Sequence, residues 1–167
     1  MARRVVIFLL LFMIPFSALA DGTRYPSGTY AVVNNPDPDD CLNLREHPWP
    51  EAKSVGKYYN GTLVRLVAEY ETSPEWVEVE IGHDRGSAFG FMMKRYLADA
   101  SSTAVRSMQP ARTAQTELRL LASPIGDAKL LALLAPGTPY TVLGYRQGYE
   151  HVQACGCLGY IASGSAK

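Results

Sequence analysis

The stretch Trp76-Val77-Glu78-Val79-Glu80-Ile81 decides the fold class. From Val77 onward, apolar and acidic residues alternate, which directs one face of an extended strand inward and the other to water. Similar short runs, rich in β-branched and aromatic residues and bounded by turn residues, predict further strands at residues 28–33, 62–69, 88–92, 118–121, 140–145, 151–154 and 158–161. Leu130 to Leu134 could instead form a helical turn. We expect an all-β protein built of small barrels, because closing a sheet removes aggregation-prone edges.

An internal repeat surrounds this strand. At an offset of 76 residues the matching pairs are Leu42 and Leu118, Leu44 and Leu120, Pro48 and Pro124, Ala52 and Ala128, Lys53 and Lys129, Gly61 and Gly137, and Thr62 and Thr138. Beyond that turn the second copy is shorter, so that residues 76–79 match 149–152 and residues 90–92 match 159–161. The glycines, the proline and the apolar alternation recur together, which indicates a duplication.

The repeat predicts two structural units after a leader. The stretch between the copies is rich in Ala, Ser, Thr and Gln, contains Pro110 and lacks apolar periodicity, so it is typical of a linker. We predict a signal peptide at 1–20, a first unit at 21–98, a linker at 99–112, a second unit at 113–162 and a tail at 163–167.

The N-terminus has the three parts of an export signal. Arg3 and Arg4 precede an apolar run from Val5 to Phe16, and Ala18-Leu19-Ala20 provides a cleavage site. A membrane anchor is the alternative, but the run is shorter than the roughly 20 residues of a spanning helix and contains Pro15. We expect a secreted or extracytoplasmic bacterial protein, in the cell wall or periplasm, with no membrane insertion after cleavage.

The charge of the mature chain argues against a nucleic-acid partner. Without residues 1–20 the chain has 14 basic and 16 acidic side chains, a net charge of −2. Residues 21–98 carry 8 basic and 12 acidic side chains, whereas residues 99–167 carry 6 and 4. This asymmetry indicates two units with different surfaces.

The ordered motifs of the first copy resemble those of the bacterial SH3 (SH3b) domain family. They are Leu42-Asn43-Leu44-Arg45, Asn60-Gly61-Thr62, Trp76-x-x-Val79, Gly90-Phe91-Met92 and Tyr96-Leu97. The resemblance covers about residues 28–98. The second copy departs from it, with Arg119-Leu120-Leu121 at the first motif and Tyr149 in place of Trp76, and is interpreted as a degenerate SH3b-like repeat.

The resemblance implies two tandem SH3-like β-barrels that bind cell-wall peptides or other extracellular ligands, usually as a targeting module beside a hydrolase. Two units and a linker account for the mature chain, so we expect a non-catalytic binding protein, not an enzyme, that recognises peptidoglycan or another wall component. The alternative is a protein-interaction or inhibitor module that binds a secreted or surface protein.

Aromatic residues in loops are the candidate ligand contacts, because aromatic faces give rigid contact area to peptides and sugars. The predicted set is Trp49, Tyr58, Tyr59 and Tyr70, with Tyr145 and Tyr149 as second-copy candidates. Trp49 lies between two prolines and is expected to be exposed. Trp76 and at least one of Tyr58 and Tyr59 are expected in the core.

The histidines and cysteines offer weaker alternatives. A Cys–His catalytic pair would have to use His47, His83, His151, Cys41, Cys155 or Cys157, yet Cys155-Gly156-Cys157 is typical of a hairpin turn. A zinc site at His151, Cys155 and Cys157 lacks a fourth ligand. For an exported chain, three cysteines favour one disulfide and one free thiol, with the pairing open. We expect no metal and no cofactor.

Overall fold

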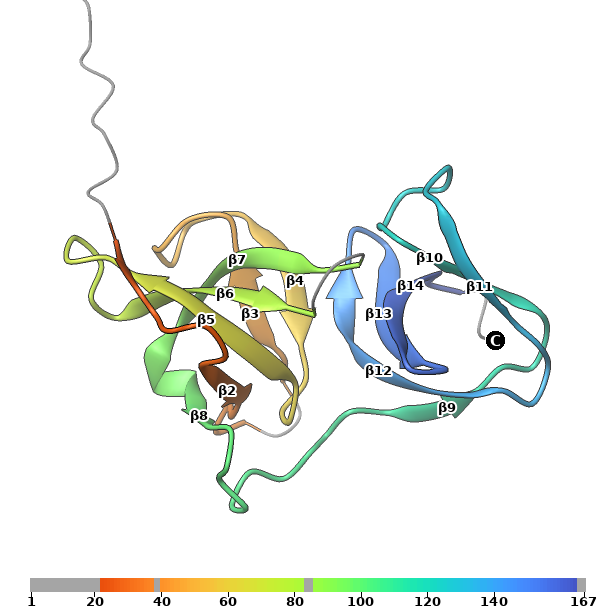
Figure 1. The fold of residues 1–167 in the computed structure, drawn as a ribbon, viewed down its shortest axis with the longest axis horizontal. Coiled ribbons are helices and arrows are strands. Elements are labelled where there is room, and N and C mark those ends of the chain that lie inside the picture. The colour runs from red at the N-terminus through yellow and green to blue at the C-terminus, as the bar shows by residue number, and fades with distance from the viewer. Residues whose placement is uncertain (1–21, 38–39, 83–85, 165–167) are drawn as a thin grey trace, which may run out of the picture.

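The computed structural model describes residues 22–37, 40–82 and 86–164 (Figure 1). The predicted signal peptide at 1–20 lies outside the described residues, and so does His83. The chain is all-β, as predicted, with a single 3₁₀ turn among the described elements. No described helix has the length and hydropathy needed to cross a membrane.

The elements follow one another along the chain as short strands joined by turns. They are β1 (Thr23–Arg24), β2 (Tyr30–Val33), β3 (Leu42–Arg45), β4 (Ser54–Tyr58), β5 (Leu63–Glu69), β6 (Trp76–Ile81), β7 (Ala88–Met93), the 3₁₀ turn η1 (Lys94–Tyr96), β8 (Leu97–Asp99), β9 (Ala111–Thr113), β10 (Leu118–Leu121), β11 (Leu130–Leu134), β12 (Pro139–Arg146), β13 (Tyr149–Ala154) and β14 (Cys157–Ala162).

Hydrogen bonds connect these strands into one sheet. The main path runs β11-β10-β14-β13-β12-β4-β3-β7-β6-β5-β2-β8, with β1 paired to β5 and β9 paired to β12. All the pairings are antiparallel. The sheet therefore passes from one half of the molecule to the other at β4 and β12, which differs from the two separate barrels expected from the sequence.

Two hydrophobic cores lie along this sheet, one in each half. The first contains the inward side chains of β2 to β7, including Val33, Leu44 and Val79, and also takes in Leu143 of β12. The second contains Leu120, Val152 and other residues of β10 to β14. In β6, Val77, Val79 and Ile81 are buried, as the alternation of residues 76–81 predicts. The acidic face departs from the prediction, because Glu80 is buried as well and forms an ion pair with Arg65. Trp76 is buried too, as expected.

The strand registers confirm the internal repeat. Leu42 pairs with Tyr58 and Leu44 with Gly56, while 76 residues later Leu118 pairs with Leu134 and Leu120 with Ala132. The β-bulges recur as well: the register shifts between Leu66 and Ala68 in β5, and between Val142 and Gly144 in β12. Since pairs and irregularities recur at the offsets seen in the sequence, both copies adopt the same strand pattern.

The two Gly-Thr turns fold as predicted. Gly61 and Gly137 have φ values of 87° and 88°, in the left-handed region where glycine is favoured. The Gly61 amide donates to the carbonyl of Val33, the last residue of β2, and the Gly137 amide donates to the carbonyl of Ala114, the residue that follows β9. The turn requirement accounts for the shared glycine.

The segment Leu130 to Leu134 is strand β11 rather than a helical turn. Leucine and alanine favour helices in isolation, so the composition alone suggested a turn of helix. In the structure β11 pairs with β10 along its length, and Leu134 enters the second core. Tertiary packing therefore overrides the local preference.

The two copies meet at equivalent positions of β5 and β12, which pair with different strands. In the first copy, Ala68 and Glu69 of β5 pair with β1. The equivalent residues of β12, Gly144 and Tyr145, pair with Tyr58 and Lys57 of β4. Strand β4 of the first copy therefore pairs with β12 at the position where β1 pairs with β5.

The predicted linker contacts both halves. The Met108 amide donates to the Asn60 carbonyl, and the Val142 amide donates to the Pro110 carbonyl, at 3.0 and 2.9 Å. Strand β9 begins at Ala111, so it includes the last two residues of the predicted linker. Residues 107–110 therefore lie against the junction.

Candidate functional site

The predicted ligand contacts occupy different environments. Trp49 is exposed, as predicted, with 47% of its surface accessible, and its ring stacks on that of His47 at a centroid distance of 4.6 Å. Tyr58 is fully buried, so its selection as a ligand contact is wrong. The alternation of β4 directs Tyr58 inward, where its hydroxyl lies 3.2 Å from Nδ1 of His151.

The other two predicted tyrosines are half-buried and bonded within the protein. The Tyr59 hydroxyl lies 3.1 Å from the hydroxyl of Tyr145, and burial together with this bond raises the pKa of Tyr59. The Tyr70 hydroxyl donates to Glu78 at 2.8 Å. None of the four predicted aromatics lines any of three pockets of the described part of the chain, two of which are described below.

The cysteines do not form the expected disulfide. Cys41, Cys155 and Cys157 are all free, with Cys155 and Cys157 exposed at the β13–β14 turn. That turn is the predicted hairpin. Burial and the neighbouring Asp40 raise the pKa of the Cys41 thiol, so its thiolate fraction at neutral pH is reduced.

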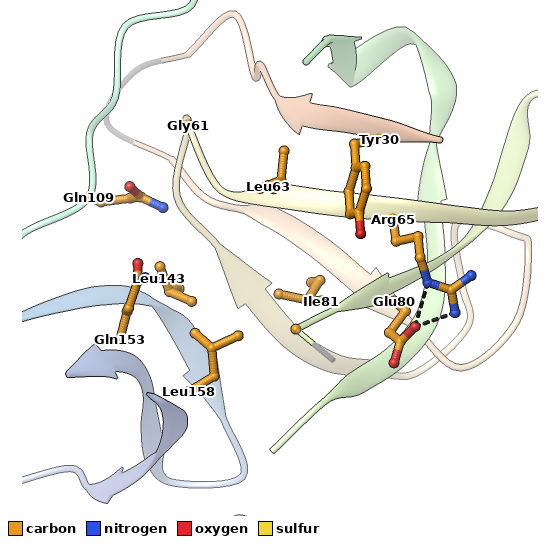
Figure 2. Close-up of a pocket in the computed structure, with 11 residues that line it drawn as sticks. Tyr30, Gly61, Leu63, Arg65, Glu80, Ile81, Gln109, Leu143, Gln153 and Leu158 are labelled. Atoms are coloured by element: carbon orange, nitrogen blue, oxygen red, sulfur yellow. Dashed lines mark hydrogen bonds and ion pairs between the residues drawn. The ribbon is translucent and has the colours of Figure 1, made fainter. Parts of the chain in front are cut away.

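A pocket lies at the junction of the two copies. It has a volume of about 310 Å³, at the small end of ligand pockets. Figure 2 shows its lining, which comes from the first copy, the linker and the second copy. The lining residues are Tyr30, Gly61, Leu63, Arg65, Glu80, Ile81, Gly82, Gln109, Leu143, Gln153 and Leu158. We call it the junction pocket.

The junction pocket combines apolar and amide surfaces. Leu143 and Leu158 of the second copy and Ile81, Tyr30 and Leu63 of the first provide the apolar surface, and Tyr30 and Leu63 are exposed (Figure 2). The side chains of Gln109 and Gln153 provide the amide groups (Figure 2). Such a surface suits a ligand with apolar stretches and amide groups.

Two polar contacts fix the edges of the pocket. Gln109 donates through Nε2 to the Thr62 hydroxyl at 3.1 Å, which holds this linker side chain against the first copy. Arg65 forms an ion pair with Glu80, its Nε donating to Oε2 at 2.7 Å. Because the two charges are paired, the wall presents little net charge to a ligand.

A second pocket, of about 280 Å³, lies on the first copy alone. Its lining includes Asp40, Cys41, Arg45 and Trp76. Arg45 donates to the Ala52 carbonyl at 2.6 Å, which ties its guanidinium to the loop that carries Trp49. This pocket is more polar than the junction pocket and draws on one copy.

The described residues contain no cluster of three or more His, Cys, Asp or Glu side chains that could hold a metal ion. His151 is buried between Tyr58 and Tyr160, whereas Cys155 and Cys157 are exposed at the turn. The structure therefore does not assemble the zinc site considered from the sequence.

Comparison with known proteins finds a curated relative. No family model matches the chain. The Bacillus subtilis protein named "Putative N-acetylmuramoyl-L-alanine amidase YrvJ" is 26% identical over 147 residues. The match covers 82% of this chain but 27% of that protein, so the chain spans about a quarter of its relative.

Two solved structures are similar at a lower level. NlpC2 and NlpC1 from Trichomonas vaginalis are each 17% identical, with TM-scores of 0.39 and 0.40. The matches cover 85% and 87% of this chain and 48% of each of those chains. At these values the likeness carries no argument about fold or activity.

These findings correct three predictions from the sequence. The assignment to the SH3b family is wrong, because no family model matches and the curated relative is named as an amidase. The predictions of a non-catalytic binding protein and of a chain that is not an enzyme are also wrong, because the curated relative is named for an enzymatic activity.

The junction pocket was missed by sequence reasoning. Its lining residues belong to six strands, two turns and the linker, and each has an ordinary local pattern in the sequence. One signal was available. The repeat has Ala68 in the first copy but Gly144 in the second, and this glycine permits the close approach of β12 to β4.

Proposed function

We propose that this chain acts in peptidoglycan hydrolysis outside the cytoplasm, and that cell-wall peptide or glycan bound at the junction pocket is the substrate. The observation that carries the proposal is the similarity, along 82% of the chain, to a protein named as an N-acetylmuramoyl-L-alanine amidase. That name describes an amide between an amino sugar and an amino acid. A substrate of this kind presents both amide groups and the apolar face of a sugar ring.

The chemistry of the junction pocket supports this choice of substrate. The side-chain amides of Gln109 and Gln153 can donate to and accept from substrate amides. The exposed ring of Tyr30 offers an aromatic face and a hydroxyl at the rim. The paired charges of Arg65 and Glu80 suit an uncharged stretch of peptide or glycan.

We also propose that the two cores mark two small barrel-like folding units, at 21–98 and 113–162, joined by the linker 99–112. Each core draws most of its residues from one of the two units, which supports this division. The junction pocket then depends on both units, because its lining comes from each.

Purified sacculi test the proposal. The mature chain should sediment with sacculi and release new free amino groups from them over time. Failure of both would overturn the proposal. Sedimentation without release of amino groups would contradict hydrolysis, and release without dependence on the pocket residues would contradict the site.

Replacing Tyr30 should separate binding from folding. Tyr30→Ala removes an exposed aromatic side chain from the pocket rim, and truncating such an anchor often costs about 2 kcal/mol, roughly thirtyfold in affinity. Co-sedimentation should weaken by about that factor while the melting temperature stays nearly unchanged. Phe89→Ala is the matched control, since Phe89 is also an exposed aromatic residue, with 53% of its surface accessible against 43% for Tyr30, but does not line the pocket. Equal losses in both variants would count against the junction pocket.

Trp49 is retained as a proposed second contact with the wall. Its exposed ring, stacked on His47, extends from the β3–β4 loop. Trp49→Ala should reduce co-sedimentation with sacculi without changing the circular dichroism spectrum. Unaltered sedimentation would remove Trp49 from the site and leave the pocket as the proposed contact.

A further inference from the structure

One edge of β11 has no strand partner among the described residues. Strand β11 lies at one end of the main path and, within the described residues, pairs with β10 alone. Its sequence, Leu-Leu-Ala-Leu-Leu, carries no charge. Leu130 and Leu133 are exposed, with 41% and 52% of their surfaces accessible. An exposed, apolar, uncharged edge strand is a template for pairing with another strand.

In the first copy the equivalent edge is paired with another strand. Strand β4 is the repeat equivalent of β11, and its outer edge pairs with β12 through Tyr58 and Lys57. The equivalent positions on β11 are Leu134 and Leu133. One of two equivalent edges is thus covered by a strand, and the other has no strand partner in the part of the chain that the structure describes.

The opposite end of the sheet is protected. Strand β8 has three residues and ends at the exposed Asp99, whose carboxylate accepts from the Ser101 amide at 2.8 Å. Short length and a terminal charge are features that discourage edge pairing. The two ends of the sheet therefore differ in their capacity to recruit a strand.

We propose that β11 is a homodimerisation edge, where the β11 strands of two copies of this chain pair antiparallel. A second copy is the fitting occupant because an apolar strand with no charge complements itself. Pairing about Ala132 places Leu133 of each copy opposite Leu131 of the other, so the exposed leucines are covered by the same contact. Such a contact is isologous and closes at two copies. The first copy's β5 edge is unavailable for this purpose, because β1 covers it.

The test is the oligomeric state of the mature chain by light scattering across a concentration series. The chain should form a dimer as concentration rises, and Leu133→Lys should remain monomeric because it brings two charges into the contact. Ile125→Lys is the control: it adds the same charge at an equally exposed apolar residue outside β11, and should still dimerise.

Folding and pairing are distinguished by a second measurement. Hydrogen exchange at the β11 amides should slow in the wild-type dimer relative to Leu133→Lys, while the amides of β13 stay equally protected in both. A wild-type chain that is monomeric throughout, or a dimer that Leu133→Lys leaves intact, would overturn the proposal. This inference is independent of the proposed hydrolysis, since it is tested without any wall material.

Discussion

Gly144→Ala should destabilise the protein by about 3 kcal/mol, the upper range for forcing an added carbon into a packed site. An ideal Cβ at Gly144 would lie 2.1 Å from the Lys57 carbonyl oxygen and 2.6 Å from the Tyr58 ring. The first obstacle is backbone, which cannot rotate away as a side chain can. Strand β12 would have to separate from β4, and the junction pocket would open with it.

Urea denaturation checks this expectation. Gly126→Ala is the matched control, because its added carbon would find the Tyr149 hydroxyl at 3.8 Å as nearest neighbour, an ordinary contact. Its free energy of unfolding should change by less than about 0.5 kcal/mol. Similar small changes in both variants would mean that the β4–β12 pairing does not constrain the junction.

Acidification should weaken the fold through His151. Burial, with a further contribution from Arg146, lowers the pKa of His151 from 6.5 to about 4. The folded state therefore favours the neutral imidazole more than the unfolded state does. Its contribution to stability is complete above pH 6.5 and is lost progressively as the pH falls toward 4. The pKa difference corresponds to about 3 kcal/mol.

Two histidine variants isolate this effect from carboxylate titration. His151→Gln keeps a group that can bond the Tyr58 hydroxyl but does not titrate, so the loss of stability between pH 6.5 and 4 should become shallower. His47→Gln, at an exposed histidine, should retain the wild-type slope. Identical slopes in wild type and His151→Gln would refute the assignment.

The sequence predicted the strands well wherever the pattern was local. The run from Trp76 to Ile81 and the run from Leu118 to Leu121 have the observed bounds of β6 and β10. The 76-residue offset of the repeat agrees with the strand registers, because the residue pairs of β3 and β4 recur 76 residues later in β10 and β11. The helical alternative at Leu130 to Leu134 failed because leucine-rich runs satisfy both periods, and pairing with β10 decides between them.

The site was much less predictable than the strands. Tyr58 and Tyr59 are adjacent, and the chain pattern could not say which one points inward; the structure buries Tyr58. The junction pocket requires β12 to meet β4, a contact between residues such as Gly144 and Tyr58 that are far apart in the chain. Hydrophobic alternation fixes which face of a strand is buried, but not which strand lies beside it.

Nuclear magnetic resonance of the labelled mature chain, titrated with soluble disaccharide-peptide fragments of peptidoglycan, tests the central claim most directly. The side-chain amide signals of Gln109 and Gln153 and the backbone amides of Tyr30 and Leu63 should shift together, because all four residues line the junction pocket. Signals around Asp40 and Trp76 in the second pocket should stay in place. Shifts confined to the second pocket, or no shifts at saturating fragment, would contradict the claim that the junction of the two copies binds the cell wall.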